Sequence, residues 1–130
     1  MRVLDTDTCV ELLRGNGTVI ARRAAVADEV VTTWITGAEL YFGAARSDAP
    51  DENEVLVNEF LETIDLLGID RRAAQVFGET KAELMGAGDL VPDADLFIGS
   101  IAIAHDAVLV TGNTRHFTRF TGLRLENWIR

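Results

Sequence analysis

The sequence predicts an α/β fold in which a central, mainly parallel sheet of short strands is flanked by helices. Short runs of β-branched and apolar residues, such as VVTTW (30–34) and AVLVT (107–111), are separated by segments with helical spacing of apolar residues. One segment, LFIGSIAIA (96–104), is apolar on all sides, as expected of a helix buried against a sheet. Strands that alternate with helices favour parallel pairing with right-handed crossovers.

The first elements are expected close to the N-terminus. Residues 2–5 are predicted to form a short strand. Thr8-x-x-Glu11 matches a capping box, so a short helix is expected over residues 9–14, and Gly15 is expected to end it.

The next segment contains a helix, a strand and a second helix. Residues 18–28 are rich in Ala and Arg and are predicted to be helical, whereas residues 30–34 have the composition of a strand. Thr36-x-x-Glu39 repeats the capping-box pattern and predicts a helix through ELYFGAAR (39–46).

The middle of the chain begins with a polar segment, SDAPDENE (47–54), which is predicted to be a loop. Apolar residues then keep helical spacing over residues 56–64, and LLGI (66–69) is a candidate strand. Asp70 is expected to cap a long helix that carries apolar residues over 73–84.

The last part of the chain completes the alternation. Pro92 and Asp93 are expected to open the buried helix of residues 96–104. A strand is predicted at residues 107–111, and LRLENW (123–128) is predicted to be the edge strand of the sheet.

Length and composition limit the class of protein. A chain of 130 residues is expected to form a single domain over residues 1–130. No apolar run approaches the length of a membrane span and the start lacks an apolar signal region, so a cytoplasmic protein without membrane contact is expected. The single cysteine, Cys9, excludes an internal disulfide, and one Cys with two His argues against a structural zinc site.

The net charge of −9 bears directly on the ligand. Asp and Glu outnumber Lys and Arg by 21 to 12, whereas a protein that holds nucleic acid through its phosphates should show basic patches. Either nucleic acid is not the ligand, or bound cations neutralise some of the acids. A basic partner protein is a further explanation for an acidic face.

Four polar residues are predicted to meet at one end of the sheet. Asp5 ends the first strand, and Glu39 lies at the start of the helix that follows VVTTW. Asp95 lies in the first turn of the buried helix, and Asn113 lies two residues beyond AVLVT. In open α/β sheets, sites form outside the carboxyl ends of the strands, so these residues are candidate site residues.

Three carboxylates packed together repel one another strongly unless a cation is present. Ligation by oxygen alone suits Mg²⁺ or Mn²⁺, which take few carboxylates together with water and substrate phosphate. Such a site can activate water for attack on a phosphodiester and stabilise the leaving oxygen.

Each residue also has an ordinary structural explanation. Asp5 can be a solvated cap, and Glu39 would be the third residue of its capping-box helix. Asp95 stands where any helix favours an acid, Asp93 is the better candidate for the cap of that helix, and Asn113 is a common turn residue. Their location at the same end of one sheet is not required by capping, and it favours a functional site.

One alternative reading is a phosphatase. Asp5-Thr6-Asp7 resembles the first motif of haloacid-dehalogenase-like phosphatases, in which the first Asp attacks phosphorus and the second acts as acid and base. GDLVPD (88–93) resembles the metal-binding motif of that family. However, Cys9 stands where Thr or Val is usual, GDLVPD follows a helix rather than a strand, and Glu39 would have no role.

The whole set of motifs resembles the PIN-domain nucleases, and in particular the VapC toxins of bacterial toxin–antitoxin pairs. LDTDTCVELLRG (4–15) resembles the opening block of that family, and ITGAELYFGA (35–44) resembles its Glu-containing helix start. Residues 81–105 resemble the stretch that carries its third acid, and residues 108–128 resemble its C-terminal block. The resemblance therefore covers the chain from end to end.

The resemblance assigns roles to particular residues. The metal-binding acids of the family fall on Asp5, Glu39 and Asp95, and its Thr-x-Asn element falls on Thr111 and Asn113. It implies that Asp5 and Asp95 ligate the ion directly, and that Glu39 completes the shell or orients a bound water. Asn113 or Thr111 would fix Asp5 or the phosphate through hydrogen bonds.

This chain departs from the family pattern at two positions. Asp7 stands where Asn is usual, which adds a carboxylate beside the predicted metal site. His116, which by itself is explained as a solvent-facing histidine, stands where several relatives have an acid. The fourth acid is then absent unless Asp93 or Asp7 substitutes for it.

The resemblance implies an Mg²⁺-dependent endoribonuclease, with Mn²⁺ able to substitute, that acts as a toxin on cellular RNA. It also implies a homodimer and a cognate antitoxin whose C-terminal segment covers the catalytic groove with a basic side chain. RNA contacts would fall to Arg14, Arg115 and Arg119. A binding module that has lost catalysis and acts only through its partner is the remaining alternative.

Overall fold

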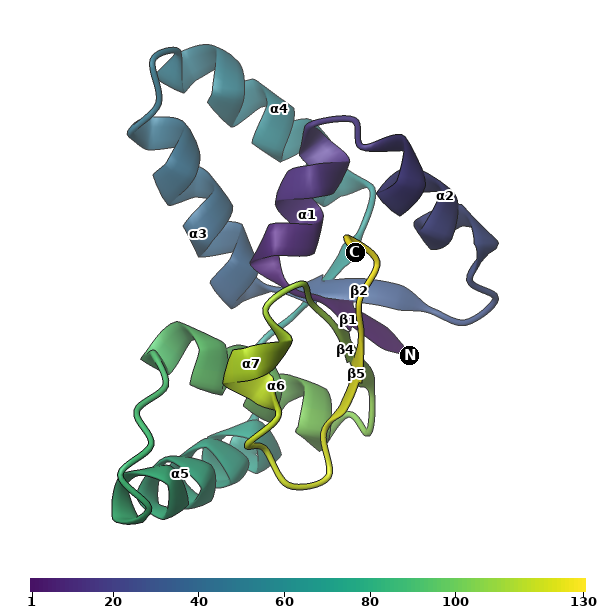
Figure 1. Ribbon diagram of the computed structural model, residues 1–130. Coiled ribbons are helices and arrows are strands. Elements are labelled where there is room, and N and C mark those ends of the chain that lie inside the picture. Colours follow the sequence, from purple (N-terminus) through teal and green to yellow (C-terminus); the bar gives the residue numbers. More distant parts are fainter.

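The sheet is parallel throughout, with the strand order β3-β2-β1-β4-β5. A computed structural model describes residues 1–130 and is drawn in Figure 1. The strands are β1 (Arg2–Leu4), β2 (Val30–Thr33), β3 (Asp65–Leu67), β4 (Val108–Val110) and β5 (Arg124–Glu126). The predicted fold class is confirmed, and all five predicted strands are present, with β5 at the edge.

The helices cover both faces of this sheet. They are α1 (Thr6–Leu13), α2 (Gly17–Ala25), α3 (Trp34–Ala45), α4 (Pro50–Glu62), α5 (Arg71–Gly86), α6 (Asp93–Ala104) and α7 (Thr114–Phe117). Figure 1 shows α1 to α4 on one side of the sheet and α5 to α7 on the other. None of the helices is both long enough and apolar enough to span a membrane.

The core is divided into two clusters because successive side chains of a strand point to opposite faces. Val3 and Leu109 belong to the cluster beneath α5 and α6, whereas Leu4 and Val110 belong to the cluster beneath α1 and α4. All four side chains are fully buried. Burial on both faces explains why these strands are continuous apolar runs rather than alternating ones.

The first predicted helix start is wrong. Asp5, not Thr8, is the N-cap of α1, and its side chain accepts a hydrogen bond from the amide of Thr6. Thr8 is buried inside the helix, where its hydroxyl donates to the carbonyl of Val110. The helix starts earlier than predicted because the acid at the end of β1 caps it directly, with no intervening loop. Gly15 follows the helix with a φ of +77°, as predicted.

The second capping box is also wrong. Thr33 caps α3, and its hydroxyl accepts from the amide of Thr36. Glu39 therefore lies in the second turn of α3, where it cannot serve a capping box, and the structural explanation for this acid is removed. Similarly, Asp93 is the first residue of α6 and Pro92 occupies the cap position, whereas Asp70 caps α5 as predicted.

Two further segments differ from the sequence prediction. The segment 47–54 is a loop only in its first half, because α4 begins at Pro50. Proline with its fixed φ suits the first turn of a helix, and two acids follow it there. The short helix α7 after Asn113 was not predicted, because four residues are too few for a periodic pattern.

Candidate active site

Asp5 occupies the carboxyl end of the central strand and is only 5% exposed. Its Oδ1 accepts from the amide of Thr6 at 2.8 Å, and its Oδ2 accepts from Oγ1 of Thr111 at 2.8 Å. Burial raises the pKa of Asp5 to about 7, and the charges of Asp7 and Asp95 add to this, against the hydrogen bonds from Thr111 and Thr6. Asp5 is thus a buried carboxyl group among other acids.

Asp7 connects the start of α1 to the turn after β4. Its Oδ2 accepts from the amide of Gly112 at 2.9 Å, and its Oδ1 lies 3.3 Å from Oγ1 of Thr8. A Cβ atom at Gly112 would lie 2.8 Å from Asp7 Oδ2 and 2.8 Å from Cδ1 of Ile129. The turn is therefore packed between Asp7 and the C-terminal segment, and a larger residue at position 112 would require the side chains of Asp7 and Ile129 to shift.

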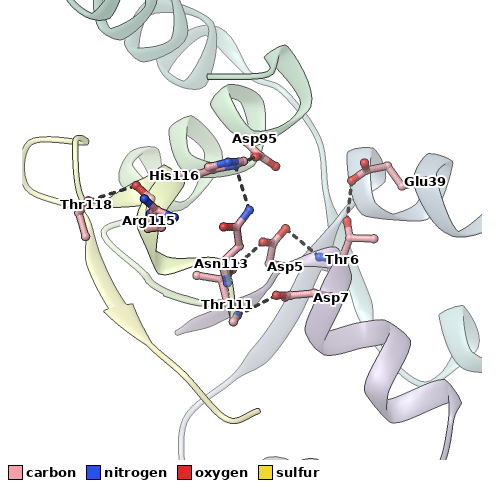
Figure 2. Close-up of polar contacts among 11 residues, drawn as sticks. Asp5, Thr6, Asp7, Glu39, Asp95, Thr111, Asn113, Arg115, His116 and Thr118 are labelled. Atoms are coloured by element: carbon pink, nitrogen blue, oxygen red, sulfur yellow. Dashed lines mark hydrogen bonds and ion pairs between the residues drawn. The ribbon is translucent and has the colours of Figure 1, made fainter. Parts of the chain in front are cut away.

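Glu39 reaches the site from α3, although its side chain is exposed. Its Oε1 accepts from Oγ1 of Thr6 at 2.6 Å, and the same hydroxyl lies 3.0 Å from Oγ1 of Thr36. The hydroxyl of Thr6 thus fixes Glu39 beside the first turn of α1, one residue from Asp5. Figure 2 shows Glu39 and Asp95 approaching Asp5 from different helices.

Asp95 lies in the first turn of α6 as predicted, with its side chain 18% exposed. Its Oδ2 is 2.7 Å from Nδ1 of His116, which is itself 2.9 Å from Nδ2 of Asn113 (Figure 2). The backbone amide of Asn113 donates to Oγ1 of Thr111 at 2.9 Å. Asn113 and Thr111 are therefore in the cluster, as predicted from the sequence.

From the sequence, His116 stands out only as a departure from the family pattern and has no assigned role in the site, because a lone histidine has an ordinary explanation as a surface residue. The spacing Asn113-x-x-His116 carries the signal that could have found it. Residues three apart lie on the same face of a helix, so a helical turn after Asn113 brings the imidazole to the same end of the sheet as Asp95.

Asp93 does not join the cluster. Its side chain is 59% exposed and pairs with Nζ of Lys81 at 3.0 Å. Asp89 pairs with Arg119 at 3.7 Å, so neither acid of GDLVPD hydrogen-bonds to the residues around Asp5. These contacts give no support to Asp93 as the fourth acid of the site. They also give no support to GDLVPD as a metal-binding motif of a phosphatase.

The donor chemistry of the cluster fits a hard divalent cation, since the groups that converge are carboxylate, amide and hydroxyl oxygens. Asp95 is close enough to Asp5 for its charge to raise the pKa of Asp5. As the side chains stand, no three His, Cys, Asp or Glu residues are grouped closely enough to hold one ion. Of the other two predicted metal-binding acids, Asp95 and not Glu39 acts on the pKa of Asp5, so Asp5 and Asp95 are the best candidates for direct ligands.

A groove of about 400 Å³ opens next to the cluster, between α1, α3 and α4. Thr6 and Glu39 lie on its wall together with Arg14 and Asn53. The rest of the lining is mostly apolar, from Val10, Leu13, Leu40, Gly43, Ala44, Leu56 and Val57. An apolar groove that shares Glu39 with an acidic cluster suits a segment with both apolar and basic side chains.

A parallel five-stranded sheet with acids at the carboxyl ends of its strands defines the class of this chain. The sequence profile of the PIN domain matches residues 2–123, so the chain belongs to the PIN-domain family. Within it, the chain is 33% identical over 128 residues to Ribonuclease VapC2 of Haemophilus influenzae, covering 98% of this chain and 97% of the relative. It is 34% identical over 127 residues to the tRNA(fMet)-specific endonuclease VapC of Salmonella typhimurium, covering 97% and 96%. The chain therefore belongs to the VapC ribonucleases, enzymes that hydrolyse phosphodiester bonds.

Solved structures agree with this assignment. VapBC2 from Rickettsia felis, bound to a DNA fragment from its promoter, matches with a TM-score of 0.92 at 28% identity, over 98% of both chains. DNA-bound VapBC from Salmonella typhimurium matches with a TM-score of 0.91 at 33% identity, over 98% of this chain and 97% of that one. The resemblance to PIN-domain nucleases expected from the sequence is confirmed.

Proposed function

We propose that this chain is a metal-dependent endoribonuclease and the toxin of a toxin–antitoxin pair, formed by a single PIN-like domain over residues 1–130. The observation that carries the proposal is the buried Asp5, whose pKa is raised to about 7 where other acids converge and no lysine or arginine pairs with it. A carboxylate in such a position is stabilised by a bound cation. The membership of the chain in the VapC ribonucleases supports the same activity.

The ion that we propose is Mg²⁺, with Mn²⁺ able to replace it. Asp5 and Asp95 would ligate it directly, and Glu39 would complete the shell or orient a water molecule. Asn113 and Thr111 hold the geometry through Oγ1 of Thr111, which accepts from Asn113 and donates to Asp5. A bound divalent cation supplies an activated water nucleophile and stabilises charge on the phosphate.

RNA is the proposed substrate, and the groups that would contact its phosphates are few. Arg115 adjoins His116 in α7, and Arg119 lies just beyond that helix. Arg119 already pairs with Asp89 at 3.7 Å, and Arg14 pairs with Glu11 at 3.9 Å, so both are partly neutralised. Bound cations would therefore have to provide much of the attraction for a polyanion in a chain of net charge −9.

The proposed partner is a cognate antitoxin, and the groove between α1, α3 and α4 is where its segment would lie. Most of the residues that line the groove are apolar, and Thr6 and Glu39 are among its polar ones. A basic side chain at the end of such a segment would neutralise the acids and displace the cation. The matched VapBC structures support a partner of this kind. We further propose that the toxin forms a homodimer and acts in the cytoplasm.

The test is RNA cleavage by purified protein freed of any partner, with and without Mg²⁺ or Mn²⁺. Wild-type protein should cut total RNA at discrete positions only when the metal is present, and Asp5→Asn should not cut. Glu126→Gln is the matched control, because that acid lies in the same fold but outside the cluster. Intact RNA with turnover of a small aryl phosphate would favour a phosphatase. A protein that acts on neither RNA nor the aryl phosphate would favour a binding module without catalysis.

A further inference from the structure

His116 contacts both of the candidate residues that flank it in space. Its Nδ1 lies 2.7 Å from Oδ2 of Asp95 and 2.9 Å from the side-chain nitrogen of Asn113. The imidazole is 40% exposed and Asp95 is 18% exposed, so the contact forms at the mouth of the cluster. Figure 2 shows the imidazole between the Asp95 carboxylate and the Asn113 amide.

The chemistry of these groups fixes the direction of the hydrogen bond. An ionised carboxylate can only accept, so the Nδ1 atom that faces Asp95 must carry the proton. Nδ1 then has no lone pair for an amide N–H. The side-chain amide of Asn113 can be turned so that its oxygen, rather than its nitrogen, faces Nδ1–H. The proton on Nδ1 is then shared by two acceptors, the Asp95 carboxylate and the Asn113 amide oxygen. Whenever the ring is neutral, Nε2 is then the nitrogen without a proton.

The same contacts form a continuous connection between the two best candidate ligands. Oγ1 of Thr111 donates to Asp5 and accepts from the backbone amide of Asn113. The side chain of Asn113 meets His116, and His116 meets Asp95. One turn, from β4 into α7, therefore sets the positions of both carboxylates relative to each other.

We propose that His116 is a positioning residue whose Nδ1–H holds Oδ2 of Asp95 and leaves Oδ1 of Asp95 free for the divalent cation. The inference rests on the proposed function, because it gives this histidine a part in building the proposed cation site. An imidazole does this without adding negative charge, and the charges of Asp7 and Asp95 already oppose ionisation of Asp5. An acid at position 116 would instead face Asp95 as a like charge.

The first test is the tautomer of His116 in the metal-free protein, read from the nitrogen-15 shifts of the neutral ring by NMR. We expect the proton to lie on Nδ1 in the wild-type protein. In Asp95→Asn, an amide nitrogen that faces the ring donates to Nδ1, and the ring proton should then leave Nδ1. His105, the C-cap of α6, makes no side-chain hydrogen bond and is the internal control. A His116 ring protonated on Nε2 in the wild-type protein would overturn the inference.

The second test is the affinity for Mn²⁺ alone, measured by electron paramagnetic resonance on metal-free variants of matched thermal stability. His116→Ala should weaken Mn²⁺ binding by about 10- to 100-fold, the range for loss of a group that orients a ligand. His116→Asn should restore affinity, because its side-chain nitrogen can replace Nδ1. His116→Gln places its nitrogen where Nε2 lies and should not. Equal affinity of His116→Ala and wild type, or rescue by Gln but not Asn, would overturn the inference.

The outcomes separate this inference from the proposed function. If wild-type protein binds Mn²⁺ and Asp5→Asn does not, the metal site stands, and an unchanged His116→Ala then rejects only the role of His116. If neither wild type nor Asp5→Asn binds Mn²⁺ and RNA cleavage needs no metal, the proposed metal site fails and the role of His116 fails with it.

Discussion

Two groups of acids in this protein, one around Arg2 and one around Asp5, differ in the kind of partner that contacts their carboxylates. Around Arg2, two acids have cations: Asp28 pairs with Arg2 and with the amine of Met1, and Glu126 pairs with Arg2 and Arg22. Around Asp5, the acids have hydroxyl, amide and imidazole partners instead.

The pKa values follow this difference. The hydrogen bond from the N-terminal amine and the charge of Arg2 lower the pKa of Asp28. Burial acts to raise the pKa of Glu126, but hydrogen bonds from Trp128 and Arg2 bring it below its ordinary value. The pKa of Asp5 goes the other way, to about 7. The acids around Arg2 pair with cationic groups of the protein itself. The acids around Asp5, where we propose that a metal ion binds, have no lysine or arginine partner.

The largest expected effect is on catalysis. Asp95→Asn keeps the shape of the side chain but removes its charge, and it should lower metal-dependent RNA cleavage by more than about 100-fold, beyond the usual loss from an orienting residue. Cleavage rates with Mg²⁺ measure this, and circular dichroism should show an unchanged fold. Glu126→Gln should leave cleavage unchanged. Full activity of Asp95→Asn would remove it from the site.

The next effect concerns stability without metal. The pKa of Asp5 rises from 3.8 to about 7 in the folded protein, so the folded chain holds the Asp5 proton more tightly than the unfolded chain. The stability that this proton gives is present below about pH 4 and is lost as the pH rises through 7. Metal-free Asp5→Asn should therefore be more stable than wild type at about pH 8, by up to about 4 kcal/mol at ~1.4 kcal/mol per pKa unit. Urea denaturation at several pH values measures this.

Wild type and Asp5→Asn should be equally stable at the most acidic pH of this series, where Asp5 is protonated in both the folded and the unfolded chain. A difference that does not change between the acid and alkaline ends would contradict the assignment of this titration to Asp5.

A smaller effect is expected in the other group of acids. Arg2→Ala leaves Glu126 with Arg22, at 3.7 Å, as its only cation, and should lower the free energy of unfolding by about 1 kcal/mol, since these groups are partly exposed. Thermal denaturation at low and high salt measures the loss, which salt should reduce. RNA cleavage per folded molecule should not change. A loss of cleavage would mean that the two groups of acids are coupled.

The smallest effect is expected for Asp7→Asn. The amide oxygen can still accept from Gly112, so the turn should persist, and cleavage should stay within a few-fold of wild type. The pKa of Asp5 should fall, because one of the charges that raises it is gone. The pH dependence of metal-free stability measures that fall. Loss of RNA cleavage in Asp7→Asn would instead favour the phosphatase reading, in which Asp7 is the acid and base.

The fold was predictable because its signals are local and repeated. VVTTW and AVLVT have the composition of buried strands, and their alternation with helices specifies a parallel sheet. That Asp5, Glu39, Asp95 and Asn113 lie at the same end of the sheet was predictable, because a parallel sheet brings the carboxyl ends of its strands together.

Helix starts and the role of His116 were not predictable in the same way. The pattern Thr-x-x-Glu occurs at residues 8–11 and 36–39, but Asp5 and Thr33 stand earlier and cap the helices first. His116 depends on a turn of four residues and on a partner in α6 that lies 21 positions away. Such contacts are set by the packing of α6 and α7, which no local pattern describes.

The hydrogen bond between Asp5 and Thr111 joins residues that are 106 positions apart. Asp5 leaves the ribosome early, whereas Thr111, Asn113 and His116 are among the later residues to emerge. Asp5 and Thr111 follow β1 and β4 directly, so their hydrogen bond forms only when β4 pairs beside β1. A nascent chain or an N-terminal fragment has Asp5 and Glu39 but no assembled site. A chain that ends before β4 therefore lacks Thr111 and Asn113, and the proposed site cannot assemble in it.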